Sequence, residues 1–153
     1  MRVYLDLCCL KRPFDSQAHP LVHIETEAVV ALLAAPEEQV RFIRSAAHAL
    51  ENAFNSVASR REAVSRWLNQ APLDTVSVNE LRLRSITLIS LGFSKFDSLH
   101  LGSAELSRAD VFVSVDYPLL NRARRQSSSL TIRVTDPIRL AEEVFGGTTD
   151  RKS

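Results

Sequence analysis

The sequence predicts a single-domain, three-layer α/β/α fold in which helices cover both faces of a mostly parallel five-stranded sheet. The chain has 153 residues, which fits one domain of ordinary size. Short apolar runs rich in β-branched residues alternate with longer stretches whose apolar residues recur at helical spacing. This alternation is typical of βαβ units joined by right-handed crossovers.

Five short runs are the predicted strands, because each is too brief for an ordinary helix and is rich in β-branched residues. In chain order they are Arg2–Asp6, Gln39–Ile43, Asp74–Val78, Asp110–Val115 and Leu130–Val134. The residues from Val111 to Val115 are apolar at almost every position, as expected for a parallel strand that is buried on both faces.

Helical spacing is found between and after these strands. The predicted helices are Leu21–Ala35, Ala46–Asn55, Val57–Asn69, Asn79–Leu91, Lys95–Ser107, Pro118–Arg125 and Ile138–Phe145. The folded domain is therefore expected to span residues 1–145. A flexible tail is predicted over residues 146–153, which are mostly small or polar.

The composition is that of a globular protein, with 45% hydrophobic and 24% charged residues, and it excludes a disordered or collagen-like chain. The longest apolar run, from Ala28 to Ala35, has 8 residues, whereas a membrane-spanning helix needs about 20. Asp6 interrupts any apolar secretory segment near the start. Cys8 and Cys9 are adjacent and so poorly placed for a disulfide. We therefore expect a cytoplasmic protein with no membrane segment.

The basic residues suggest a phosphate-containing partner only through their type and grouping, because the formal net charge is just +1. Arginine outnumbers lysine by 16 to 3, and arginine is the better bidentate ligand of phosphate. The candidate phosphate contacts are Arg60-Arg61 and the group Arg122, Arg124 and Arg125. A genome rich in G and C would give the same ratio, and each cluster alone also fits a solvated surface.

Two acids directly follow predicted strands. Asp6 comes after Val3-Tyr4-Leu5, and Asp116 comes after the strand that ends at Val115. Both carboxylates are thus expected at the carboxyl edge of the sheet, where open α/β proteins bind their ligands. Like charges at one edge repel each other unless a divalent cation lies between them, and Mg²⁺ or Mn²⁺ prefers oxygen ligands. Alternatively, each residue is a turn former or the N-cap of the next helix.

Two further acids and a histidine lie on predicted helices that can reach the same edge. Glu51 occurs in an otherwise apolar stretch, so its side chain faces either water or a metal. Asp97 follows Ser94 by three residues, which fits a capping pattern as well as a ligand near the positive end of a helix dipole. His100 lies one turn beyond Asp97 and fits either a site-lining residue or a buried, hydrogen-bonded histidine.

Four segments, taken in order, carry a family resemblance. They are Val3-Tyr4-Leu5-Asp6, Leu50-Glu51-Asn52, Phe96-Asp97-Ser98-Leu99-His100-Leu101-Gly102-Ser103-Ala104 and Ala109-Asp110-Val111-Phe112-Val113-Ser114-Val115-Asp116. Their order and spacing resemble the motifs of the PIN domain, particularly of its VapC-like bacterial ribonucleases. The resemblance extends from Met1 to about Phe145.

The resemblance implies a five-stranded parallel sheet, an acidic pocket that binds Mg²⁺ or Mn²⁺, and endonucleolytic hydrolysis of RNA. By position, the catalytic and metal-binding quartet is Asp6, Glu51, Asp97 and Asp116. Ser114 takes the place of a Ser or Thr that the family often has, and His100 would line the site. The resemblance also implies a toxin with a small antitoxin partner, and a homodimer. Cys8 departs from the pattern, because such toxins often have a small polar residue there.

Two other functions remain open at this point. The first is a catalytically silent PIN-like module that binds RNA or protein, against which the presence of all four acids argues. The second is a phosphotransferase with Asp6 as its nucleophile, which would need a second acid two residues later, where the chain has Cys8. For an RNA-cleaving enzyme, a single-stranded substrate is expected rather than a duplex.

Overall fold

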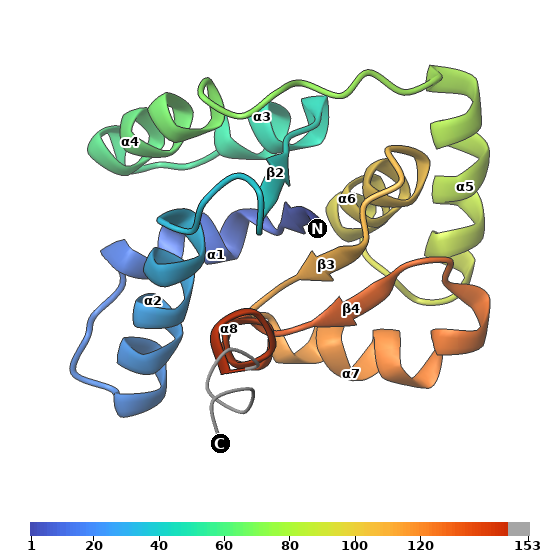
Figure 1. Cartoon of the computed structure of the whole chain (residues 1–153). Helices are drawn as coiled ribbons and strands as arrows, with labels where there is room; N and C mark the ends of the chain where they lie inside the picture. Colours follow the sequence, from blue (N-terminus) through green and yellow to red (C-terminus); the bar gives the residue numbers. More distant parts are fainter. Residues whose placement is uncertain (147–153) are drawn as a thin grey trace.

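The computed structural model describes residues 1–146 and contains a sheet of four parallel strands flanked by helices (Figure 1). The strand order is β2-β1-β3-β4. The strands are β1 (Arg2–Leu5), β2 (Arg41–Ile43), β3 (Val111–Val113) and β4 (Arg133–Thr135). The predicted α/β class with a parallel sheet is confirmed. The flexible tail predicted over 146–153 lies, from residue 147 onward, outside the described residues.

The helices alternate with the strands as the sequence predicts. They are α1 (Leu7–Lys11), α2 (Pro20–Leu33), α3 (Ala46–Asn52), α4 (Ala58–Leu68), α5 (Val78–Ser90), α6 (Lys95–Leu106), α7 (Tyr117–Arg125) and α8 (Pro137–Ala141). Short helical turns follow three of them, at Arg12–Phe14, Ser127–Ser129 and Glu142–Gly146.

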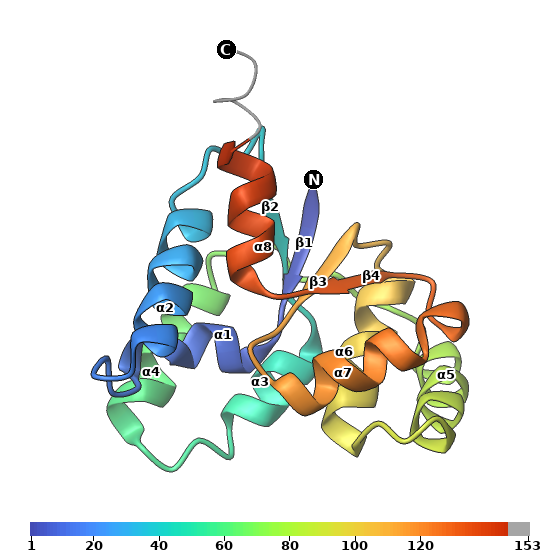
Figure 2. The same cartoon turned by 90° about the horizontal axis from the view of Figure 1, so that it is seen from below.

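The side chains of β1 alternate between two hydrophobic cores, one on each face of the sheet. Val3 and Leu5 lie in a core that includes residues of α2, α4 and α8, whereas Tyr4 lies in a second core with residues of α5, α6 and α7. Figure 2 shows the two groups of helices on opposite sides of the strands. A strand that is buried on both faces has no polar face, which explains the continuous apolar runs in the sequence.

The chain connections place a topological switch point between β1 and β3. From β1 the chain crosses to β2 on one side and then returns to β3 on the other side of β1. Register pairs Tyr4 with Ile43 and with Phe112, so the three strands end at nearly the same level. The residues that follow them are therefore gathered at the crevice in which open α/β sheets bind ligands.

The prediction of a fifth strand at Asp74–Val78 is wrong, because this segment does not join the four-stranded sheet. Leu73 makes one isolated parallel bridge to Arg44 just beyond β2, and the backbone N–H of Asp74 donates to the Arg44 carbonyl at 3.0 Å. The chain then leaves the sheet edge, and Ser77 caps α5. Val78 is 71% exposed. The β-branched residues of this segment thus have neither a partner strand nor a core to cover, and their strand propensity does not prevail.

Helix α1 is the element that the sequence analysis did not anticipate. Its five residues, LCCLK, directly follow β1 and are too few to show helical spacing. Asp6 begins the helix, because a carboxylate oxygen of Asp6 accepts a hydrogen bond from the Leu7 backbone N–H at 2.9 Å. This short helix places Cys8 and Lys11 beside the carboxyl edge of the sheet.

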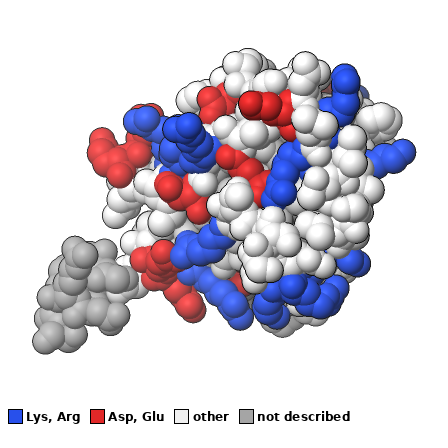
Figure 3. Space-filling view, turned by 90° about the vertical axis from the view of Figure 1, so that its right-hand side faces the viewer, with Lys and Arg blue, Asp and Glu red and all other residues white. Residues whose placement is uncertain are grey.

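Helix α5 presents an apolar face to solvent. Leu83 and Ile86 are 68% and 60% exposed, although Leu88 on the opposite face is buried against α6. Figure 3 shows a broad uncharged area on the side of the molecule that carries α5, with basic side chains around its margin. Within residues 1–146, no helix combines the length and the apolar character needed to cross a bilayer.

Candidate metal centre

Asp6 lies at the carboxyl end of β1 and is 5% exposed. One carboxylate oxygen caps α1, and the other accepts a hydrogen bond from the Ser114 hydroxyl at 2.8 Å. The Cys8 thiol donates to that second oxygen at 3.3 Å. Asp6 is therefore a helix cap that can still serve as a metal ligand, because the oxygen that caps α1 accepts one hydrogen bond and keeps a second lone pair.

Ser114 connects Asp6 with Asp116 at the end of the neighbouring strand. Its hydroxyl donates to Asp6 and accepts from the Asp116 backbone N–H at 3.0 Å. Asp116 in turn caps α7 by accepting from the Leu119 N–H at 3.4 Å. Ser114 is fully buried, so this bridge fixes the relative position of the two strand ends.

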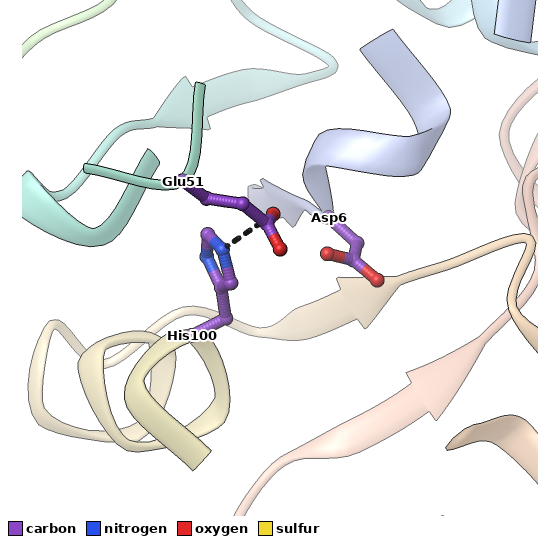
Figure 4. Close-up of side chains that lie close together, drawn as sticks. All are labelled: Asp6, Glu51 and His100. Carbon is purple, nitrogen blue, oxygen red and sulfur yellow. Dashed lines mark hydrogen bonds and ion pairs between the residues drawn. The ribbon is translucent and has the colours of Figure 1, made fainter. Parts of the chain in front are cut away.

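Glu51 reaches the same edge from α3, and His100 reaches it from α6. The Nε2 atom of His100 and an Oε1 atom of Glu51 are 3.1 Å apart. Ligand atoms of Asp6, Glu51 and His100 all lie within 4.8 Å of one another, and Figure 4 shows the Asp6 and Glu51 carboxylates pointing toward a common space. The structure thus brings residues from three separate elements within reach of a single cation.

A buried hydrogen-bond chain supports the Glu51–His100 pair. Nδ1 of His100 lies 2.6 Å from the Tyr4 hydroxyl, which lies 2.6 Å from the Ser45 hydroxyl at the start of α3. The Ser45 oxygen accepts from the Ala47 N–H, so a consistent direction runs from Ser45 through Tyr4 and His100 to Glu51. Burial raises the pKa of Tyr4 well above its usual value, which keeps the phenol protonated and able to donate.

His48 packs against this chain in the neutral form. Its ring stacks on Tyr4 with centroids 4.4 Å apart, Nε2 lies 2.6 Å from the Leu5 carbonyl, and Nδ1 accepts from the Ser45 N–H. Burial, and then the electrostatic effect of the neighbouring His100 imidazole, lowers the pKa of His48 to about 3. Both ring nitrogens are occupied, so His48 supports the site without being available as a ligand.

Asp97 lies in the first turn of α6, and the charges of Asp6 and Asp116 affect its pKa. Burial, and then the negative charges of Asp6 and Asp116, raises the pKa of Asp97 to about 6, against the opposing effects of Ser94 and His100. The cap of α6 is Ser94, whose hydroxyl oxygen accepts from the Asp97 N–H at 3.1 Å. The Asp97 carboxylate is therefore not needed to begin the helix.

The donor set fits a hard divalent cation. Asp6 and Glu51 offer carboxylate oxygens beside each other, and neighbouring negative charges raise the cost of ionising Asp97. A cation would relieve this repulsion, and carboxylates together with water are the usual ligands of Mg²⁺ and Mn²⁺. Asp6, Glu51 and, through its imidazole, His100 are the residues whose ligand atoms lie close enough together to hold it.

The arginines predicted to contact phosphate occupy the last turn of α7. This helix begins after Asp116 and runs away from the acidic edge, so Arg122, Arg124 and Arg125 lie roughly 9–13 Å along its axis from Asp116. They do not form one cluster, because Arg122 packs against Gly92, where an added Cβ would lie 2.2 Å from its Nη1. Arg124 lines a separate hollow with Asp136 and Arg139.

A second basic group, which the sequence analysis did not connect with the acids, lies closer to Asp116. A hollow of about 410 Å³ is lined by Lys11, Arg12, Arg60 and Asp116, and also by Cys8 and Asn55. Arg60 and Arg12 are held there by Asp15, at 3.6 and 3.1 Å. Lys11 and Arg12 are neighbours in the sequence, but Arg60 lies on α4, so no local sequence pattern could reveal the whole group.

Two solved structures share this architecture. A chain of VapBC-1 from nontypeable Haemophilus influenzae is 17% identical, with a TM-score of 0.58, and the alignment covers 90% of this chain and 98% of that chain. A chain of FitAcB from Neisseria gonorrhoeae is 16% identical, with a TM-score of 0.51 and coverage of 88% and 97%. At such low identity the likeness establishes the fold, not the activity, and the predicted PIN-like fold is confirmed.

Sequence comparison adds no closer assignment. No family model matches this chain, and no curated protein matches it either.

Proposed function

We propose that this protein is a divalent-metal-dependent endoribonuclease that hydrolyses phosphodiester bonds of RNA. The observation that carries the proposal is the convergence of Asp6 and Glu51, with His100, at the switch point of a PIN-like sheet. Asp97 lies close enough to Asp6 and Asp116 for their charges to act on it. Four acids in one crevice are costly for folding, and holding a cation explains why they are together.

The protein groups divide the work between ligation and positioning. Asp6 and Glu51 would hold the ion, while Ser114 fixes the rotamer of Asp6 and His100 fixes that of Glu51. A divalent cation held there would supply Lewis acidity for activating water and for neutralising charge on the scissile phosphate. Asp97 and Asp116 would complete the shell or orient the attacking water. The cations beside Asp116 would hold a neighbouring phosphate of the strand.

We further propose that the enzyme is the toxin of a toxin–antitoxin pair. This proposal rests on the motif resemblance to VapC-like ribonucleases and on the fold shared with chains of VapBC-1 and FitAcB. A small antitoxin protein would then be a partner, and a homodimer would be the form of the toxin. Neither partner is needed for the chemistry proposed at the acidic edge.

Cleavage of a labelled single-stranded RNA in Mg²⁺ or Mn²⁺ tests the enzymatic proposal. Wild-type protein should cleave it, and EDTA, Asp6→Asn, Glu51→Gln and Asp116→Asn should each abolish cleavage while the fold is retained. Glu38→Gln is the matched control, because Glu38 is an exposed acid at the amino end of β2, and it should cleave normally. Metal-independent cleavage would contradict the proposal, and RNA binding without cleavage would instead identify the silent PIN-like module.

A further inference from the structure

Two phenylalanines lie next to the proposed metal-binding residues. Phe54 follows α3 and is 73% exposed, and Phe96 lies in the first turn of α6 beside Asp97. Their ring centroids are 6.0 Å apart, and the rings meet edge to face at 66°. An edge-to-face pair leaves ring faces uncovered, so the pair presents aromatic surface to solvent next to the proposed ligands.

The aromatic pair lies outward of the other side-chain contacts between α3 and α6. One of these inner contacts is Glu51–His100, at 3.1 Å. Phe54 follows Glu51 by three residues, just past the end of α3, and Phe96 precedes His100 by four within α6. The backbone position of each phenylalanine is therefore about one turn from that of its inner neighbour. Exposure rises outward from the buried His100 to Phe54. A chain bound at the metal-binding residues would therefore pass the rings as it leaves the crevice.

The exposure of Phe54 has no evident structural benefit. Burying a phenylalanine side chain stabilises a fold by roughly 1.5–3 kcal/mol, and most of this gain is forgone here. Single exposed apolar residues are common, but this does not explain an edge-to-face pair of rings beside a group of acids. Ring faces that stay in water are suited to stacking on flat groups, and nucleic-acid bases are such groups.

We propose that Phe54 and Phe96 form a base-stacking platform that selects single-stranded RNA for the acidic site. This inference rests on the proposed function and specifies its substrate class. Bases in a duplex are already stacked, whereas bases of a single strand can be splayed onto aromatic side chains. Stacking does not depend on the identity of the base, so the platform would give strand selectivity rather than sequence specificity. The cation-lined hollow on the Asp116 side would hold the adjoining phosphates.

Binding measured without turnover separates this inference from the nuclease proposal. Fluorescence anisotropy with a labelled single-stranded RNA is recorded at low salt in EDTA, so that the strand is not cut. Phe54→Ala should weaken binding roughly fivefold or more, and Phe54→Trp should bind at least as well as wild type, because the larger ring can still stack. The matched control is Leu83→Ala on α5, where the side chain is similarly exposed but distant from the acids, and its binding should be unchanged.

The RNA itself provides the second control. A strand of the same length with abasic positions keeps its phosphates, so wild type and Phe54→Ala should bind it equally. A duplex should also be insensitive to Phe54→Ala. Equal loss of affinity for duplex, abasic and intact strands would overturn the platform, and so would unchanged binding by Phe54→Ala. If Phe54→Ala binds RNA as wild type does, the two rings would instead be candidates for contact with a protein partner. Cleavage by wild type with no effect of Phe54→Ala on binding would contradict the platform alone.

Discussion

Asp97 is an acid whose negative charge disfavours the metal-free folded protein. Its pKa in the folded state is raised to about 6 from an ordinary value of 3.8. A raised pKa means that the folded state binds the proton more tightly, so this group favours folding below about pH 4, and the advantage is lost as the pH rises through 6. At pH 7.5 the charged carboxylate therefore destabilises the metal-free fold.

Asp97→Asn should accordingly raise the melting temperature in EDTA at pH 7.5. The increase should be about 2–4 °C for each kcal/mol of repulsion removed, and it should shrink as the pH is lowered to 4, where wild-type Asp97 is also neutral. Melting curves of the two proteins over this pH range measure the difference. A difference that does not vary with pH would show that the pKa of this carboxyl is not raised by burial and its acidic neighbours.

The two functions considered for Asp97 can be separated by comparing it with Ser94. Ser94 caps α6, so Ser94→Ala should cost about 1 kcal/mol of stability and leave RNA cleavage largely intact. Asp97→Asn keeps the backbone N–H that Ser94 accepts from, and it should instead lose cleavage and Mn²⁺ affinity. Normal turnover by folded Asp97→Asn protein would remove Asp97 from the proposed quartet.

Tyr4 holds His100 in place from the protein interior. Its hydroxyl group can be removed by Tyr4→Phe, which keeps the buried aromatic ring. Tyr4→Phe leaves His100 Nδ1 and the Ser45 hydroxyl without this buried partner, which should cost about 1–3 kcal/mol of unfolding free energy. Urea titration measures the loss. We also expect weaker Mn²⁺ binding, because His100 no longer holds Glu51 in one orientation. Unchanged stability and unchanged metal affinity would show that the chain of hydrogen bonds is not a supporting element.

At the residue scale the sequence identified the acids and two of the residues that hold them, Ser114 and His100, but not Tyr4 or Ser45. Asp6 and Asp116 could be predicted to share an edge, because each follows a continuous apolar strand and parallel strands end together. Tyr4 and Ser45 are 41 residues apart and carry no local pattern, so their hydrogen bond could not be read from the sequence. Ligation by the predicted quartet remains a prediction that the mutants above test.

At the scale of elements, the last turn of α7 carries the arginines predicted to bind phosphate. Arg124→Ala with Arg125→Ala removes the two exposed members and spares Arg122, which packs against Gly92. If both bind RNA phosphates, the slope of log K for single-stranded RNA against log salt concentration should become shallower. The change should be about 0.7 for each phosphate that is no longer neutralised. An unchanged slope would show that these arginines form only a solvated surface. Lys11→Ala provides the comparison on the Asp116 side.

The elements themselves are predictable where packing agrees with local pattern. The predicted α6 differs from the observed helix by one residue, because Ser94 at its start and the apolar stripe facing the sheet both favour it. The β-branched residues of Asp74–Val78 predict a strand, but only Leu73, just before this segment, pairs with the sheet. Strand formation depends on a partner and a covered face, and neither can be read from five residues.

At the scale of the whole molecule, the fold class follows from the alternation of strands and helices. Each hydrophobic core lies between the sheet and the helices on one of its faces. Strand β1 contributes side chains to both cores. The same arrangement brings residues 6, 51, 97, 100 and 116 to one edge of the sheet, although they are spread over most of the chain. This acidic edge is therefore a property of the fold rather than of any one element.

The central claim, that the acidic edge of the sheet holds a divalent cation, is tested most directly by calorimetric titration of Mn²⁺ into the metal-free protein. Wild type and Glu38→Gln should bind Mn²⁺ alike, whereas Glu51→Gln should lose most of the binding heat while its circular dichroism spectrum stays unchanged. If wild type and Glu51→Gln give the same isotherm, or if neither binds, the acids do not form a metal site and the account is wrong.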